Sequence, residues 1–344
     1  MNIIDRKINR WREAYEIKPG ERKFLLIAEF PDKGISTPPP MRPDMMAERL
    51  EWNKSHYDYM LGRCEALDDD LLPHLQLRTG TEIHAACFGS EVYYPVNSNP
   101  CAIPFVKTES EADKVKKPNL YDTPLAALLD MAEKMREYGG KDALMGLPDM
   151  QSPMDIVALI WDKSYLFSAM YDCPEAVKTL AGKVSEFMFD FLDALFEIYG
   201  ERYIAHYPSY YMEKGVTMSV DEVGAVSAPM FNEFFRDELD ALSERYGGIG
   251  IHCCANARHQ WENFREVKGL RLMNLTNVQT YLDDSHKVFA KTCMQYPILS
   301  DYANPAPLKI APPEQYPAGS YVLTVRCESI EHAKKEIDRL KEIY

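Results

Sequence analysis

The chain has 344 residues, of which 46% are hydrophobic and 27% are charged, an ordinary composition for a globular protein with a large core. Its formal net charge of −14 disfavours a nucleic-acid partner, because proteins that bind nucleic acids are normally basic. No apolar run approaches the length of about 18 residues that a membrane span requires, so no membrane partner is expected either.

The N-terminal segment MNIIDRKINRWREAYE is charged throughout and has neither the apolar region nor the cleavage site of a signal peptide. Without an export signal, we expect a cytoplasmic protein. The eight cysteines are then expected to be thiols rather than disulfides. Most of them are expected in the core, where free cysteine is commonly buried, so a functional cysteine has to be identified from its own context.

Residues 1–70 are expected to form a helical leader, separate from the domain that follows. Residues 11–16 (WREAYE) and 43–67 (PDMMAERLEWNKSHYDYMLGRCEAL) are typical of helices. Between them, residues 24–30 (FLLIAEF) are typical of a strand. The proline cluster at 36–43 (STPPPMRP) excludes a helix there, because proline lacks the backbone donor that a helix needs.

From residue 71 onward, short apolar runs alternate with long amphipathic segments. The runs expected as strands are LLPHLQL (71–77), DALMGLP (142–148), RYIAHYP (202–208), GGIGIHCC (247–254), LRLMNLT (270–276) and YVLTVRC (321–327). The segments expected as helices are residues 174–200, 228–248 and 331–344. A strand followed by a helix, repeated along the chain, implies parallel strands. We therefore predict an α/β fold in which residues 71–344 form a (β/α)8 barrel, with a doubly wound sheet as the alternative.

One of these runs leads into the sequence GIGIHCCAN (248–256), which contains side chains that bind metals. Side chains alternate between the two faces of a strand, so His252 and Cys254 point the same way and Cys253 points the opposite way. In a (β/α)8 barrel the active site lies at the carboxyl ends of the strands. His252 and Cys254 are therefore expected to face the site, and Cys253 to pack against the helices.

Another cysteine, Cys327, ends the run YVLTVRC in the same way. One imidazole and two thiolates form a donor set that suits zinc, and three protein ligands leave a fourth position open, as in catalytic zinc sites. We therefore predict a zinc site formed by His252, Cys254 and Cys327. The alternative is a histidine and cysteines that belong to the core and bind nothing.

The segment SAPMFNEFFRDELDALSERYGGIGIHCCAN (227–256) resembles the S-P-x-x-F-x-x-F … H-x-C-G-N segment of the uroporphyrinogen decarboxylase superfamily. The upstream segment QSPMDIVALIWDKSYLFSAMYDCPEAVKTL (151–180) is similar to its G-P-x-x-x-A … D-x-P-E-x-V segment. The resemblance extends from about Leu71 to the C-terminus and implies a (β/α)8 barrel preceded by a helical leader. Ala255 departs from the glycine that the superfamily usually has after the cysteine.

Two branches of this superfamily differ in chemistry. The decarboxylases carry an N-terminal P-x-W-x-M-R-Q-A-G-R motif, whose arginines bind the carboxylates of the substrate, and the comparable region here, FLLIAEFPDKGISTPPPMRP, lacks it. The corrinoid-dependent methyltransferases carry zinc on H-x-C-x(n)-C, which His252, Cys254 and Cys327 match. The resemblance therefore implies a zinc-dependent enzyme that moves a methyl group from a small donor, such as a methoxylated aromatic or a methylamine, to the cobalt of a separate corrinoid carrier protein.

Other activities stay open at this point. A methylcobamide:thiol methyltransferase would run toward a thiol acceptor, a decarboxylase-type lyase would need no zinc, and a zinc-stabilised scaffold that docks a corrinoid protein would not be an enzyme. The chain lacks the D-x-H-x-x-G … S-x-L … G-G pattern of corrinoid-carrying domains, so methylcobamide is expected to arrive on the partner. A homodimer is a further possible assembly.

Other polar residues near expected strand ends are candidates for the same site. His206 and Tyr207 in YIAHYP could reach a pocket, and Asp221 and Glu222 in MSVDEVG could supply an acid or a fourth zinc ligand. Asn256 follows the ligand pair and could orient the cofactor loop. Further tyrosines that could line the pocket are Tyr93, Tyr94, Tyr210, Tyr211 and Tyr302. The alternatives are a core histidine, tyrosines at a half-buried rim and solvated loop charges.

Overall fold

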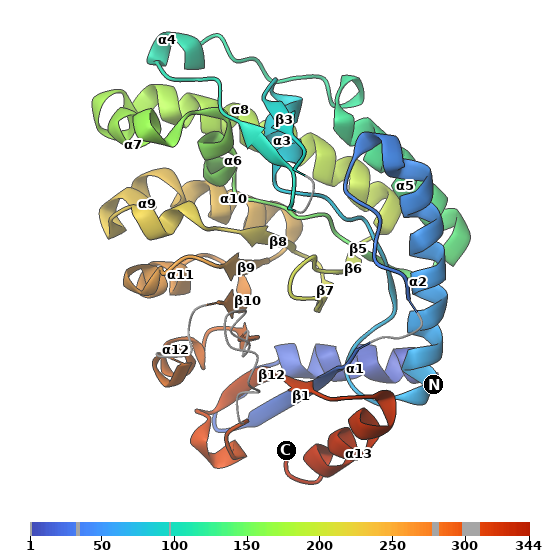
Figure 1. Ribbon diagram of the computed structural model, residues 1–344. Coiled ribbons are helices and arrows are strands. Elements are labelled where there is room, and N and C mark those ends of the chain that lie inside the picture. The colour runs from blue at the N-terminus through green and yellow to red at the C-terminus, as the bar shows by residue number, and fades with distance from the viewer. Residues whose placement is uncertain (1, 32–34, 96–97, 277–281, 298–309) are drawn as a thin grey trace.

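The computed structural model describes residues 2–31, 35–95, 98–276, 282–297 and 310–344. Its strands lie at the centre and its helices lie around them, as Figure 1 shows. In the described part of the chain, the barrel strands are β1 (Arg22–Glu29), β2 (His74–Gln76), β5 (Leu144–Gly146), β8 (Val216–Ser219), β9 (Ile249–Cys253), β10 (Leu270–Leu275), β11 (Met294–Gln295) and β12 (Gly319–Arg326). The predicted (β/α)8 barrel is confirmed.

Hydrogen bonding joins these strands into two sheets that together form the ring. One parallel sheet has the order β1, β12, β11, β10, β9, β8, and the other contains β2, β5, β6 (Arg202–Ile204) and β7 (Tyr211–Glu213). A parallel bridge between Gln151 and Ser219 connects the loop after β5 to β8. β6 pairs in parallel with β5 and forms an antiparallel hairpin with β7, and β3 (Glu91–Tyr93) pairs with β4 (Cys101–Ile103) separately.

The helices cover the outside of the barrel (Figure 1). Their buried apolar residues belong to the core that they share with the strands. The α-helices are α1 (Ile3–Tyr15), α2 (Met46–Ala66), α3 (Glu82–Cys87), α4 (Glu109–Ala112), α5 (Pro124–Gly139), α6 (Pro153–Ile160), α7 (Lys163–Asp172), α8 (Pro174–Tyr199), α9 (Ala228–Phe234), α10 (Arg236–Tyr246), α11 (Trp261–Arg265), α12 (Leu282–Phe289) and α13 (Ile330–Lys341). The 3-10 helices are η1 (Pro43–Met45), η2 (Leu120–Asp122), η3 (Glu222–Ala225), η4 (Arg258–Gln260) and η5 (Pro313–Gln315). Among the described residues, no helix combines the length and the apolar character needed to cross a membrane.

The long helices begin and end at the residues that the sequence marks. α8 begins with Pro174 and is capped by Gly200 at φ 77°. The segment expected as one helix at 228–248 forms two, α9 and α10, which are separated at Phe235. α10 ends at Tyr246 and is capped by Gly247, whose left-handed conformation at φ 86° is one that glycine adopts without strain.

The expected leader, residues 1–70, is not separate from the barrel. It contains the predicted helices as α1 and α2, but β1 pairs in parallel with β12 from Arg22 opposite Gly319 to Glu29 opposite Arg326. The boundary at residue 70 therefore divides the barrel sheet. The physical reason is that β1 is apolar on both faces, since Leu25 packs into the main core and Leu26 packs in the cluster that includes α13.

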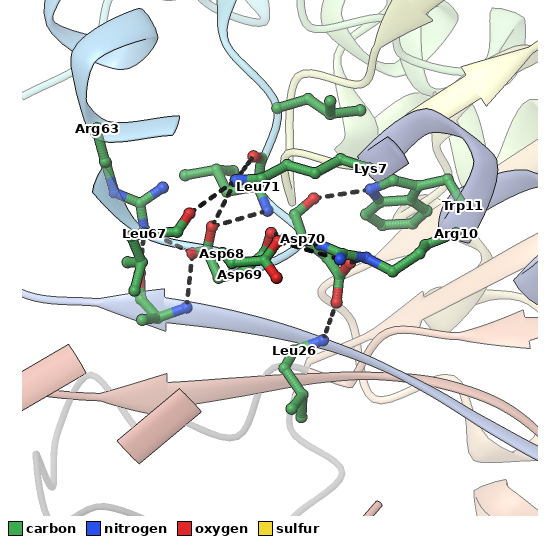
Figure 2. A network of polar contacts seen from close by, with 12 residues as sticks. Lys7, Arg10, Trp11, Leu26, Arg63, Leu67, Asp68, Asp69, Asp70 and Leu71 are labelled. Carbon is green, nitrogen blue, oxygen red and sulfur yellow. Dashed lines mark hydrogen bonds and ion pairs between the residues drawn. The ribbon is translucent and has the colours of Figure 1, made fainter. Parts of the chain in front are cut away.

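The ring closes between β1 and β2 through hydrogen bonds of Asp69 and Asp70 rather than through strand pairing. The backbone N–H of Leu26 donates to Asp70 Oδ2 at 2.7 Å, and that of Ala28 donates to Asp69 Oδ2 at 3.2 Å. The N–H of Asp70 donates in turn to the carbonyl oxygen of Leu26 at 2.7 Å. Figure 2 shows these aspartates beside β1. The carboxylates therefore satisfy backbone donors that the buried edge of β1 would otherwise leave unpaired.

Buried cations balance Asp69. Lys7 of α1 and Arg63 of α2 contact its two carboxylate oxygens at 3.2 and 2.7 Å, and all three side chains are buried. Lys7 Nζ also donates to the carbonyl oxygens of Leu67 and Leu71 (Figure 2). Lys7, Arg63 and Asp69, here called the Asp69 cluster, therefore tie both N-terminal helices to the barrel.

The packing inside the barrel explains a glycine in β9. A Cβ built on Gly250 would lie 2.1 Å from the Oη atom of Tyr210, which is buried and hydrogen-bonded to Thr217 at 2.8 Å. Gly250→Ala is therefore expected to lower the free energy of unfolding by about 1–3 kcal/mol, the usual cost of overpacking. Urea denaturation followed by circular dichroism measures this change.

Gly182→Ala is the matched control, because no atom lies within 4 Å of the Cβ built at that position of α8. Its stability is expected to stay the same or to rise by up to about 1 kcal/mol, since alanine favours a helix over glycine. Adding Tyr210→Phe to Gly250→Ala should restore part of the loss, because the clashing hydroxyl is removed. Unchanged stability of Gly250→Ala would contradict this account of the barrel packing.

Candidate metal centre

Strand register brings the candidate site residues together. Ser219 of β8 lies opposite His252 of β9, and Asn274 of β10 lies opposite His252 on the other side. Asp221 lies two residues after Ser219, and Cys254 lies two residues after His252. Because side chains alternate, each is expected on the same face as the residue two positions before it, just beyond the strand end. The backbone N–H of Cys254 donates to Asp221 Oδ1 at 2.6 Å. The loops after β8 and β9 are therefore joined at the carboxyl ends of the strands.

Among the described residues, Asp221, His252 and Cys254 form a group whose ligand atoms lie within 4.8 Å of one another. His252 is buried, Asp221 is half-buried and Cys254 is exposed, so the group is open to solvent. Cys253 is fully buried and lies on the opposite face of β9, in agreement with strand alternation. A histidine nitrogen, a thiolate sulfur and a carboxylate oxygen are all ligands that zinc accepts. We name Asp221, His252 and Cys254 the metal triad.

A buried asparagine that the sequence interpretation did not identify orients His252. The Nδ1 atom of His252 lies 2.5 Å from Asn274 Oδ1, and Asn274 Nδ2 donates to the carbonyl oxygen of Tyr296. Because the Asn274 oxygen can only accept, Nδ1 of His252 carries the proton. Its Nε2 atom is then available to a metal, the arrangement usual for metal-binding histidines. The signal in the sequence was an asparagine inside the apolar run LRLMNLT.

Asn274→Ala is expected to weaken zinc binding about 10- to 100-fold, the usual effect of removing a group that orients a metal-binding histidine. Competition with a chelator of known affinity measures the change. Asn256→Ala is the matched control, because Asn256 is exposed in the loop after Cys254, and its zinc affinity should equal that of the parent chain. Equal losses in the two variants would show that Asn274 has no specific role.

The surroundings of Cys254 disfavour its thiolate. Partial burial and the adjacent Asp221 carboxylate raise the pKa of the Cys254 thiol to about 12. A bound divalent cation would oppose both effects, because it stabilises the thiolate. Asp155 of α6 holds the loop in place by accepting the backbone N–H groups of Asp221 at 2.8 Å and of Glu222 at 2.9 Å. Burial, together with the charge of Asp221, raises the pKa of Asp155 well above its usual value.

The other predicted polar residues lie around the triad. Glu222 forms an ion pair with Lys163 and is not part of the triad. His206 follows β6, with its Nε2 atom 3.9 Å from Asp149 Oδ2. Burial lowers the pKa of His206, and the Asp149 carboxylate opposes part of this effect. Tyr207 packs edge-on against His252, with the ring centroids 5.3 Å apart.

Cys327 does not lie with the other two predicted ligands. Its side chain is buried in a hydrophobic cluster with Val325 of β12 and Ile337 of α13. Cys327 has the same parity as Val325, so it faces the helices rather than the barrel interior. The predicted convergence of Cys327 with His252 and Cys254 is therefore absent from this structure, which places the carboxylate of Asp221 beside them.

The predicted tyrosines occupy different surroundings. Tyr210 and Tyr211 are buried in the core, whereas Tyr93 at the end of β3 is exposed. Tyr94 lies below the guanidinium of Arg42, which is 5.4 Å from the ring centroid. Tyr302 lies outside the described residues. Of the predicted tyrosines that the structure describes, Tyr207 is therefore the one that contacts the metal triad directly.

A cavity of about 210 Å³ adjoins the metal triad. Its lining comes from the carboxyl ends of β2, β5 and β6 and includes Arg78, His206 and Tyr207. Since Tyr207 also contacts His252, the cavity and the triad share this side chain as a wall. A larger cleft of about 990 Å³ includes residues that precede β6 and β8, at the opposite end of the barrel, where catalytic residues are not found in such folds.

The fold and the site together define a (β/α)8 barrel protein with a candidate metal centre at the carboxyl ends of its strands. The family model described as Uroporphyrinogen decarboxylase (URO-D) matches residues 80–295, well over half of the chain. The chain is therefore a member of the uroporphyrinogen decarboxylase family, which confirms the resemblance at the level of the family.

A solved structure of a methyltransferase from Methanosarcina mazei is similar to this chain, with a TM-score of 0.62 and 13% sequence identity. The similarity covers 91% of this chain and 95% of that chain. At this level of identity it demonstrates a shared fold. No curated protein matches the sequence.

Proposed function

We propose that the chain is a zinc-dependent methyltransferase that moves a methyl group from a small donor to the cobalt of a separate corrinoid protein. The observation that carries the proposal is the metal triad at the carboxyl ends of β8 and β9, where barrel enzymes hold their active sites. The methyltransferase from Methanosarcina mazei, which has the same fold, supports this reaction class.

The donor set of the triad fits Zn²⁺. Asp221, His252 and Cys254 would hold the ion, and Nε2 of His252 is available because Asn274 engages Nδ1. One thiolate and one carboxylate cancel the charge of the ion, as two thiolates would. Three protein ligands leave a position for the donor. Zinc bound there would act as a Lewis acid on the oxygen or nitrogen that carries the methyl group.

The exposure of the site suits a reaction with a second protein. Cys254 is exposed, so a corrinoid carrier can approach the donor from the open side of the triad. The donor's C–O or C–N bond breaks with its electron pair on the heteroatom, and Co(I) supplies the pair for the new C–Co bond. The products are methyl-Co(III) and the demethylated donor. Tyr207 and His206 line the adjoining cavity and would orient the donor.

Methyl transfer can be followed by the absorption spectrum of cobalt. The zinc-loaded chain is mixed with cob(I)alamin and, in turn, with methoxylated aromatics and methylamines, and we expect the Co(I) spectrum to change to that of methyl-Co(III). His252→Ala should abolish the change, because it removes a zinc ligand and the ring that Tyr207 contacts. Cys253→Ala should keep it, because that thiol is buried on the other face of β9.

Other outcomes distinguish the alternatives. Demethylation of methylcobalamin by thiols, without cobalt methylation by any donor, would reverse the direction and define a thiol methyltransferase. Release of CO₂ from a porphyrinogen without any cobalt chemistry would reject methyl transfer in favour of a lyase.

A further inference from the structure

Arg78 is a cation in the cavity beside the metal triad. It follows β2, lines the cavity of about 210 Å³ and is half-buried. No carboxylate of the described residues lies within ion-pairing distance of its guanidinium. Burial lowers the pKa of Arg78, and no acidic neighbour offsets the effect. A partly buried cation without a counter-ion is costly, so its position calls for an anion from outside the chain.

The surroundings of Arg78 add positive charge. Arg49 of α2 donates a hydrogen bond from Nη2 to the carbonyl oxygen of Arg78, which anchors the backbone there. Burial and then the charge of Arg78 lower the pKa of Arg49. The acid near Arg49 is Glu82, and burial raises the pKa of Glu82 to about 7, so it is only partly ionised near neutral pH. The charge at this end of the site is therefore positive.

The end of the site nearer to the triad is acidic. Asp149 accepts a hydrogen bond from the Ser219 hydroxyl at 3.2 Å and lies 3.9 Å from His206. Ser219 is directly opposite His252 in the sheet, and Asp221 of the triad follows two residues later. The cavity lining therefore carries the cation Arg78, whereas the residues around Ser219 include the acids Asp149 and Asp221. This polarity would orient a donor with its anionic group on Arg78 and its methyl group near the triad.

We propose that Arg78 binds a carboxylate of the methyl donor, so that the substrates of this chain are small methyl donors that carry a carboxylate. The inference rests on the proposed methyl transfer and makes its substrate class more specific. A guanidinium binds a carboxylate through two parallel hydrogen bonds, which fix the orientation of the ligand. At about 210 Å³, the cavity is smaller than the range of about 300–1,000 Å³ typical of drug-sized ligands, so the donor is small.

The test compares donors that differ in a carboxylate and measures binding apart from transfer. The pairs are 4-methoxybenzoate with methoxybenzene, and glycine betaine with tetramethylammonium. Isothermal titration calorimetry with the zinc-loaded chain measures affinity, and cob(I)alamin reports transfer. In at least one pair, we expect the compound with the carboxylate to bind at least about tenfold more tightly than its partner. A tenfold difference in affinity corresponds to one charge-assisted hydrogen bond.

Variants of Arg78 connect this preference to one side chain. Arg78→Gln is expected to weaken carboxylate binding about 10- to 100-fold and to leave binding of the partner compound unchanged. Arg78→Lys should give an intermediate loss, because it keeps the charge but not the paired donors. Arg339→Gln on α13 is the matched control, since that arginine pairs with Glu336 on the surface, and it should change neither affinity. Circular dichroism should show the parent fold in every variant.

The failure of this inference differs from the failure of the proposed function. Carboxylate binding that does not depend on Arg78, or no carboxylate preference in either pair, overturns the inference, and cobalt methylation by any donor would still support the proposed function. Arg78-dependent carboxylate binding without cobalt methylation supports the carboxylate site and counts against the proposed function. Absence of both overturns both.

Discussion

Under the proposed function, replacing Cys254 with alanine is expected to reduce zinc affinity by more than about a hundredfold and to abolish methyl transfer. The reason is that Cys254 supplies the single thiolate of the metal triad. Removing a group that only orients a ligand lowers metal affinity about 10- to 100-fold, and removing the ligand itself should lower it further. Asp221→Ala and His252→Ala should behave alike, because each removes one of three protein ligands. Metal analysis after dialysis against a weak chelator measures the zinc that each variant retains.

Cys253→Ala and Cys327→Ala are the matched controls, since both thiols are buried away from the triad and both variants should retain zinc. Cys327→Ala is the more informative of the two. Loss of zinc in Cys327→Ala, with retention in Asp221→Ala, would contradict the triad and support the ligand set predicted from the sequence. Chelation should leave the circular dichroism spectrum unchanged, because a barrel with a large core does not need the metal to fold.

Asp69→Ala is expected to lower the free energy of unfolding by about 3–5 kcal/mol, the usual cost of removing one partner from a buried ion pair. It leaves Lys7 and Arg63 buried without the carboxylate that both contact. It also leaves the N–H of Ala28 without its acceptor on the edge of β1. Urea denaturation followed by circular dichroism measures the loss.

The neighbouring aspartate provides the control for this prediction. Asp68 pairs with Arg10 and Lys341, but its side chain is 45% exposed, so Asp68→Ala should cost no more than about 1 kcal/mol. Asp69→Asn should fall between the two, because the amide keeps an acceptor for the backbone. Similar losses for Asp68→Ala and Asp69→Ala would show that burial of the Asp69 cluster does not determine its energetic role.

The fold class could be predicted because strands covered on both faces are nearly continuous apolar runs. The runs that contain β9, β10 and β12 are of this kind and were identified. β8 was not identified, because its four residues include Thr217 and Ser219, and β11 has only two residues. Pairing with neighbouring strands defines both of these, and pairing is not visible in a short segment of sequence.

The leader shows the same difference between local patterns, which the sequence reveals, and pairing with distant strands, which it does not. Its helices and its strand were visible as local patterns, but the division at residue 70 was wrong in placing the strand outside the barrel. β1 joins the sheet through β12, almost 300 residues later, and through carboxylates of the Asp69–Asp70 segment. Contacts over such distances in the chain leave no local periodicity in the sequence.

For the site, the order of residues along β9 is enough to predict that His252 and Cys254 share one face and that Cys253 takes the other, because alternation acts between neighbours along one strand. Which residues meet this pair depends on how distant segments pack together. The register of β8 against β9 placed Asp221 beside Cys254, and packing against α13 turned Cys327 toward the helices. The physical reason is that alternation follows from the covalent geometry of one strand, whereas register and side-chain direction beyond a strand end depend on hydrogen bonds and packing between distant segments.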